Sequence, residues 1–66
     1  MAMLKVIEVL AESETSWEDA AHIAISRATE TVHNVKSIYI KNFEATVEDG
    51  QISKYRINAK ISFVLD

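Results

Sequence analysis

The chain has no cysteine among its 66 residues, and this absence excludes disulfide bonds and metal sites built on thiolates. A chain this short buries only about 60% of the surface that it exposes when unfolded. Small domains compensate with disulfides, bound metals or self-association. Because disulfides are excluded, self-association is the leading expectation, and we predict a homo-oligomer of a single domain that spans residues 1–66.

Concentrated positive charge is also absent. Ten acidic side chains outnumber seven basic ones and no basic cluster occurs, which argues against a nucleic-acid partner. No stretch reaches the length of a membrane span, and the apolar residues 1–10 contain Lys5 and Glu8 and lack a cleavage site, unlike a signal peptide. We therefore expect a cytoplasmic protein that engages neither nucleic acid nor a membrane.

Residues 16–33 form the only segment with the apolar period of an amphipathic helix. Ser16 is suited to cap its start, and Asp19, three residues later, is placed to answer the Ser16 backbone. At the far end, Asn34 tolerates the left-handed conformation of a C-terminal cap. The stripe is mostly alanine, so the layer that covers it must supply the bulk. Its members are Trp17, Ala20, Ala21, Ala24, Ile25, Ala28 and Val32.

Strand patterns fill most of the remaining sequence. Residues 3–10 are apolar on both alternate sets, which indicates a strand covered on both faces and favours a second subunit as one of the covers. Residues 11–15 form a polar connector to the helix. Residues 35–47 alternate, but the apolar phase changes between Ile40 and Phe43, so we expect a bulge or bend near residues 41–43.

Glycine occurs once, in the pair Asp49-Gly50, and Asp-Gly between two alternating runs is a strong hairpin signal. The strand before this turn must pair antiparallel with residues 52–65, whose odd-numbered positions from Tyr55 to Leu65 are apolar. The pattern therefore predicts the α+β class, as a β-α-β-β chain with a three-stranded sheet curled over one helix.

The sequence shows no catalytic arrangement, because no serine lies in a nucleophile motif and His22 and His33 are too far apart on the helix to share a metal. We therefore expect no enzyme. The acidic residues around the helix start, Glu12, Glu14 and Glu18, could hold a divalent cation across a symmetry axis. The helix dipole explains Glu18 without any ligand, so both interpretations stay open.

One face of the last strand carries a row of three cations and an asparagine between Lys54 and Lys60, with Arg56 among them. Such a row is usually a solvated face. Together with Ser37 and Tyr39 of the neighbouring strand, it could also line a pocket for a polar or anionic ligand between subunits.

Four stretches of this sequence, KVIEVL, SWEDAA, AISRATETVHNV and YRINAKISFVLD, resemble the dodecins, a family of small flavin-binding proteins, over nearly the whole chain. The resemblance implies a β-α-β-β protomer in which an antiparallel sheet partly wraps the helix. It also implies assembly into a hollow homododecamer with cubic symmetry, which agrees with the two-faced first strand.

Dodecins typically stack paired flavins between tryptophans of the second strand and hold the flavin edge with a glutamine of the third. In this sequence the tryptophan position is Ser37 and the glutamine position is Arg56. Serine offers no aromatic face for stacking, whereas the fork of arginine suits planar or anionic groups such as phosphate.

The resemblance and its departures leave two functional expectations. In the first, a non-enzymatic dodecin-like shell binds a flavin (riboflavin, FMN or FAD) or a similar small ligand for storage or sequestration, at Ser37, Tyr39 and Arg56. In the second, the shell binds no flavin and has a metal-ion-binding or structural role, with Glu12, Glu14 and Glu18 at symmetry axes. The missing tryptophan favours the second.

Overall fold

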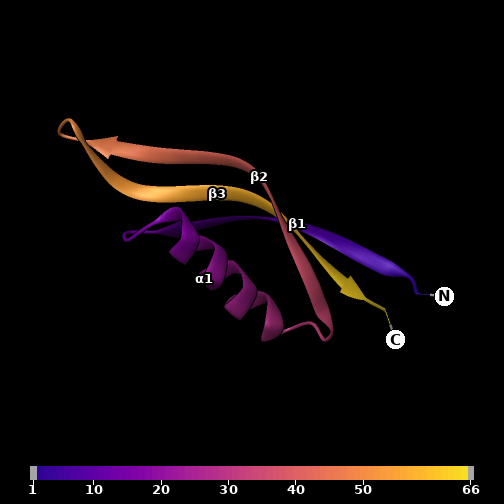
Figure 1. Cartoon of the computed structure of the whole chain (residues 1–66). Helices are drawn as coiled ribbons and strands as arrows, with labels where there is room; N and C mark the ends of the chain where they lie inside the picture. The colour runs from indigo at the N-terminus through magenta and orange to yellow at the C-terminus, as the bar shows by residue number, and fades with distance from the viewer. Residues whose placement is uncertain (1, 66) are drawn as a thin grey trace.

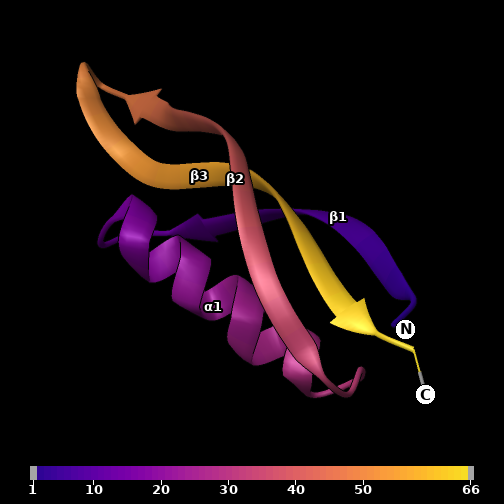
Figure 2. The same cartoon turned by 45° about the vertical axis from the view of Figure 1, so that its right-hand side comes forward.

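A computed structural model describes residues 2–65 of the chain. It contains, in order, β1 (Leu4–Ser13), α1 (Trp17–Thr29), β2 (Val35–Glu48) and β3 (Gln51–Val64). The strands form one three-stranded antiparallel sheet that bends over the single helix (Figures 1 and 2). The predicted β-α-β-β fold is therefore confirmed.

β3 lies at the centre of the sheet, with β1 and β2 at the two edges. The predicted hairpin joins β2 to β3 through Asp49 and Gly50, whose φ angles are +52° and +75°, as a tight turn with two left-handed residues requires. The predicted bulge is also present, because the register shifts between Ile40 and Asn42. A further shift between Thr46 and Val47 has no counterpart in the sequence pattern.

The core lies between the alanine stripe of α1 and the inner face of β3. Ala20, Ala24 and Ala28 are buried, and the two largest fully buried side chains are Ile57 and Ile61. Alanine lets the helix lie close to the sheet, so the isoleucines of β3 fill the space between them. This division between a thin helix face and a bulky covering layer is the predicted one.

The helix ends earlier than predicted, at Thr29 instead of residue 33. The amide of Thr31 donates to the carbonyl of Ala28 in a tight final turn, and β-branched residues at this point weaken helix propagation. Asn34 does adopt a left-handed conformation, with φ +60°. It lies just before β2, however, where it turns the chain into the strand and does not cap the helix.

The start of the helix follows the prediction in one hydrogen bond and departs from it in another. The amide of Asp19 donates to Ser16 Oγ at 2.9 Å, as a capped helix requires. The carboxylate of Asp19 accepts a hydrogen bond from the hydroxyl of Ser13 at 2.6 Å, so it does not answer the Ser16 backbone. Ser13 is buried and also accepts from the amide of Thr15 at 2.9 Å. Ser13 therefore organises the connection from β1 to α1.

Two strand boundaries also differ from the predicted ones. Residues 11–13, predicted as a connector, continue β1 because Ala11, Glu12 and Ser13 stay in register with β3. Leu65, predicted as the last residue of the strand, lies beyond the end of β3 and is 43% exposed. α1 falls short of the length and apolar character that crossing a membrane requires, and the described residues contain no other helix.

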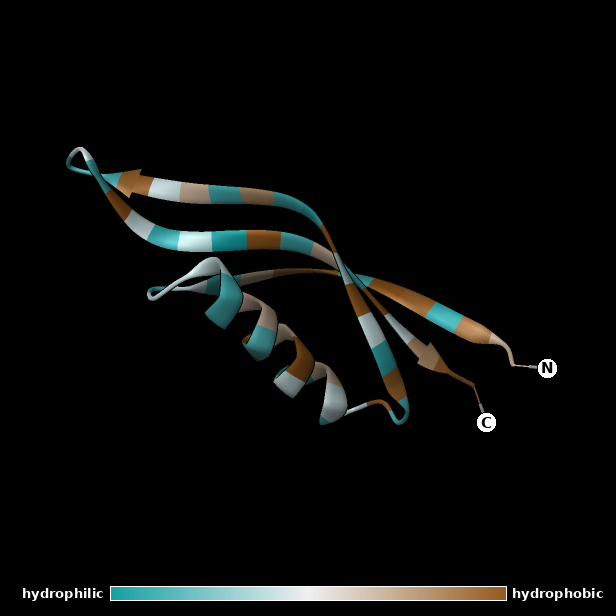
Figure 3. Ribbon diagram, in the orientation of Figure 1, coloured by the Kyte–Doolittle hydropathy of each residue, from teal (hydrophilic) through white to brown (hydrophobic). Residues whose placement is uncertain are grey.

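The protomer leaves apolar surface open on both edge strands. On β1, Leu4, Val6 and Leu10 are each more than half exposed, whereas Ile7 and Val9 pack against the core. Figure 3 shows the apolar bands of β1 and further apolar bands on β2 and β3 close to their turn. Exposed apolar strips of this kind mark interaction surfaces, which agrees with the prediction that another subunit covers β1.

Candidate functional site

The face of the sheet that points away from α1, called here the outer face, carries most of the predicted site residues. The even-numbered residues of β3 from Lys54 to Ser62 point to this face, because their odd-numbered neighbours Ile57, Ala59 and Ile61 are buried against the helix. Arg56, Asn58, Lys60 and Ser62 are each flanked by a residue of β1 and a residue of β2, whereas Lys54 pairs only with Thr46 of β2. The outer face is thus built from three-residue rows that cross the sheet.

The row centred on Arg56 is an ion-pair network that joins all three strands. Arg56 lies between Glu12 of β1 and Glu44 of β2. Its Nε and Nη2 donate to Glu12 Oε2 at 2.8 and 2.5 Å, and its Nη1 donates to Glu44 Oε1 at 3.4 Å. Lys54 Nζ lies 4.0 Å from the other oxygen of Glu12. We call Glu12, Arg56 and Glu44 the arginine clamp.

The arginine clamp keeps both of its principal partners charged. The hydrogen bond from Arg56 holds the pKa of Glu12 below its usual value of 4.5, although partial desolvation opposes this effect. The same hydrogen bond raises the pKa of Arg56. Three of the five N–H groups of the guanidinium already donate to carboxylates, so a ligand that approaches these three must compete with Glu12 and Glu44.

Ser37 and Tyr39 lie on the outer face but far from the clamp. Ser37 is opposite Ser62, with the two hydroxyls in hydrogen-bond contact, and Tyr39 is opposite Lys60. Ser62 lies six positions after Arg56 along β3, which corresponds to about 20 Å along a strand. One protomer therefore does not bring Ser37 and Arg56 together, and a ligand that touches both needs a second copy of the chain.

The three predicted metal ligands do not converge within one copy either. Glu12 belongs to the arginine clamp and lines a shallow hollow together with Glu14, Ser13 and Lys54, whereas Glu18 lies in the first turn of α1 and does not line this hollow. Among residues 2–65 no three acidic or histidine side chains gather as a set of metal ligands. Within the protomer, the cation nearest to Glu12 is the guanidinium of Arg56, and Lys54 Nζ lies 4.0 Å from its other oxygen.

Glu44 is the site residue that the sequence analysis missed. If the pairing of Glu48 with Gln51 at the turn continued along the hairpin without a shift, Phe43 would lie opposite Arg56. The register shift between Thr46 and Val47 moves the pairing by one residue and brings Glu44 opposite Arg56 instead. The acidic residue was visible in the sequence, but its partner depended on this shift.

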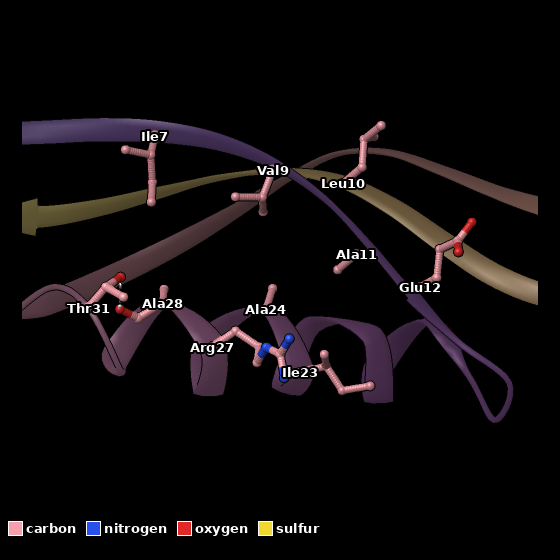
Figure 4. A pocket seen from close by; sticks show the side chains of 10 residues that line it. All are labelled: Ile7, Val9, Leu10, Ala11, Glu12, Ile23, Ala24, Arg27, Ala28 and Thr31. Atoms are coloured by element: carbon pink, nitrogen blue, oxygen red, sulfur yellow. Dashed lines mark hydrogen bonds between the residues drawn. The ribbon is translucent and has the colours of Figure 1, made fainter.

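A second feature of the protomer is an apolar groove of about 450 Å³ between β1 and α1. Figure 4 shows Ile7 and Val9 of β1 pointing toward the helix, with Ile23 and Arg27 on the helix side and Leu10 directed away. The groove follows β1, which pairs only with β3 and so has a free edge. It lies on the other side of β1 from the outer face.

These features define the class of protein: a small β-α-β-β protomer with one helix inside a bent sheet, a polar outer face and apolar surface left open. The dodecin family model matches residues 3–66. Calcium dodecin from Mycobacterium tuberculosis is 33% identical over 63 residues, which span 96% of this chain and 89% of that protein. The chain therefore belongs to the dodecin family.

Solved structures agree with this assignment. Dodecin from Streptomyces coelicolor gives a TM-score of 0.95 at 25% identity and covers 98% of this chain and 93% of its own. The crystal structure of the M. tuberculosis calcium dodecin, described as having a novel calcium-binding site, gives a TM-score of 0.84 at 34% identity, with coverages of 97% and 91%. The backbone thus follows the Streptomyces dodecin more closely, whereas the sequence is nearer to the calcium dodecin.

Proposed function

We propose that the protein assembles into a homododecameric shell of the dodecin type and acts in the cytoplasm as a binding protein without enzyme activity. Membership of the family supports a homo-oligomer. The open apolar surface of the protomer supports it independently, because Leu4, Val6 and Leu10 of β1 are 54%, 54% and 66% exposed. Contiguous apolar surface of this kind is covered in a stable protein.

The ligand that fits this chain best is a divalent cation, with Ca²⁺ first, rather than a flavin. The observation that carries the proposal is the arginine clamp. At the position where the resemblance implies a glutamine, Arg56 donates to Glu12 and Glu44, and at the tryptophan position Ser37 contacts Ser62. A flavin would find no aromatic ring at Ser37 and a guanidinium already paired with two carboxylates at Arg56, and a relative 33% identical to this chain is named calcium dodecin.

We place the cation where acidic residues of neighbouring copies meet, with Glu12, Glu14 and Glu18 as the candidate ligands. Glu14 and Glu18 form no ion pair within residues 2–65, so their oxygens are available to a hard cation. One copy provides too few converging oxygens. A site at a symmetry axis would gain the same carboxylates from each copy and so reach the coordination number that Ca²⁺ requires.

A flavin or another planar anionic ligand is the second candidate, at Ser37, Tyr39 and Arg56. One observation favours it: Tyr39 is 64% exposed on the outer face, opposite Lys60, which has no ion-pair partner among residues 2–65. This ligand would require Arg56 to leave Glu12. Storage or sequestration is the role that either ligand would imply for a hollow shell.

The test combines a mass measurement by light scattering with two titrations of the purified protein. Calorimetry with CaCl₂ after chelator treatment should give binding heat in the wild type and little in Glu14→Gln with Glu18→Gln. The matched control Glu30→Gln, another exposed acid of the helix region, should keep the heat. A monomeric mass would contradict the shell. The second titration follows the fluorescence of riboflavin, and its quenching without Ca²⁺ binding would favour the second candidate.

A gain-of-function variant tests whether the two substituted positions close the flavin site. Ser37→Trp with Arg56→Gln supplies the stacking ring and frees Glu12 and Glu44 from the guanidinium. We expect the double variant to quench riboflavin fluorescence, whereas wild-type protein at the same concentration should not. An assembled double variant that ignores riboflavin would show that Ser37 and Arg56 are not the residues that exclude it.

A further inference from the structure

The β2–β3 hairpin extends beyond the rest of the sheet. The last pair between β1 and β3 is Ser13 with Tyr55, so the residues from Thr46 to Lys54 pair only with one another across the Asp49-Gly50 turn. We call residues 46–54 the arm. Figures 1 and 2 show that the arm projects past the first turn of α1 and has no other element beside it. A two-stranded ribbon without a covering layer is marginally stable in water.

One face of the arm is apolar and uncovered. The register shift after Thr46 leaves Ser53 without a partner and puts Ile52 opposite Val47, so these two side chains share a face. Val47 is 65% exposed and Ile52 is 53% exposed. Phe43, at the base of the arm, is 63% exposed. The register shift thus places Val47 and Ile52 together as an apolar strip that no other element of the protomer covers, whereas the ring of Phe43 also meets that of Trp17.

The β1–α1 groove of another copy is complementary to this strip. The groove is lined mainly by aliphatic side chains and by two charged ones, Arg27 of α1 and Glu12 of β1, whose carboxylate is already paired with Arg56. Arg27 has no ion-pair partner among residues 2–65, and neither do Glu48 and Asp49 at the tip of the arm. An apolar strip with an acidic tip therefore matches an apolar groove with a basic side.

We propose that the arm of one copy docks into the β1–α1 groove of a second copy, with Val47 and Ile52 in the groove and the acidic tip beside Arg27. The proposal rests on the proposed shell, and it names the segments that meet in it. The contact is heterologous, since arm and groove are different surfaces of the same chain. Such contacts close into rings when the rotation allows it, as a shell with cubic symmetry requires.

Cysteine cross-linking tests the contact directly, because the chain has no cysteine of its own. The variant Arg27→Cys with Glu48→Cys carries one thiol at the groove and one at the arm. Under mild oxidation it should form covalent oligomers larger than dimers on a non-reducing gel, since each copy offers both halves of the contact. The single variants Arg27→Cys and Glu48→Cys should give dimers at most.

Charge reversal gives a second, independent measurement. Arg27→Glu should raise the concentration at which half of the shell dissociates by roughly tenfold, because like charges would then face each other. Adding Glu48→Arg should restore assembly, and the matched control Lys36→Glu, at an exposed lysine without an ion-pair partner, should leave it unchanged. Far-UV circular dichroism checks that each variant is folded.

The outcomes separate the inference from the proposed function. A wild-type chain that stays monomeric by light scattering contradicts the shell and the docking together. Wild-type assembly without higher covalent oligomers in the double cysteine variant, and without rescue by Glu48→Arg, overturns the docking alone and leaves the shell standing. A groove that still takes up an apolar dye in the assembled wild type would likewise overturn it.

Discussion

The same two strands, β2 and β3, pass through two different surroundings. Beside the helix, Ile57, Ala59 and Ile61 are completely buried, whereas in the arm Val47 and Ile52 are more than half exposed. The difference follows from length. A helix of 13 residues spans about 20 Å, and a strand of 14 residues spans about 46 Å. One helix therefore covers less than half of each strand, and the remaining apolar positions need another cover.

We expect the largest effect on stability when isoleucine is replaced by alanine beside the helix, and a different effect when the same replacement is made in the arm. Ile57→Ala removes a fully buried side chain and should lower the free energy of unfolding by about 2–5 kcal/mol. Ile52→Ala, in the arm, should change mainly the part of the stability that depends on protein concentration, since its cover is a second copy. Urea unfolding at two protein concentrations measures both. Equal losses that do not depend on concentration would contradict the distinction.

Trp17 connects the two surroundings and should give the next largest effect. Its Nε1 donates to the carbonyl of Glu44 at 2.8 Å, and its ring meets Phe43 and Tyr55 edge to face. Trp17→Ala should cost about 2 kcal/mol of unfolding free energy, because the ring packing and the hydrogen bond are both lost. Trp17→Phe keeps an aromatic ring and should cost about 1 kcal/mol.

Hydrogen exchange of the arm amides would sharpen this second prediction. If Trp17 holds the base of the hairpin to the helix, Trp17→Ala should speed exchange in β2 and β3 near Phe43 and Tyr55 more than near Ile61. Uniform acceleration over the whole sheet would show that Trp17 supports the fold in general and does not specifically anchor the arm.

The sequence was sufficient for the parts of the fold that depend on local pattern. The helix stripe, the Asp49-Gly50 turn and the bulge after Ile40 follow from apolar spacing and turn chemistry. The end of the helix and the part played by Ser13 did not follow. Ser13 is buried by tertiary packing and donates to the carboxylate of Asp19, which the capping-box pattern would instead pair with the backbone of Ser16.

The candidate site was only partly predictable for a related reason. Arg56 and Glu12 were both identified as site residues, but in different sites, because their pairing depends on which strands lie side by side. The central place of β3 brings them together. Glu44 joins them only because the register shifts by one residue in the arm. Strand order and register are set by long-range packing, which a single sequence specifies weakly.

The smallest effect concerns the arginine clamp, which forms one of the last three-stranded rows before the arm begins. The folded pKa of Glu12 is lowered, chiefly by the hydrogen bond from Arg56. Its contribution to stability is therefore complete above the usual value of 4.5 and is lost as the pH falls through the lowered folded value. Because the side chains of Arg56 and Glu12 are 32% and 35% exposed, solvent screening keeps this contribution small.

Glu12→Gln should thus reduce stability at neutral pH and make the acid side of the stability profile flatter than in the wild type. The matched control Glu8→Gln removes a looser pair, in which Lys41 Nζ lies 3.8 Å from the carboxylate and both side chains are about half exposed. Thermal unfolding between pH 3 and pH 7 measures both variants. If Glu12→Gln lost stability with acid as steeply as the wild type does, the arginine clamp would not stabilise the sheet next to the arm. Trp17 would then be the contact that stabilises this part of the hairpin.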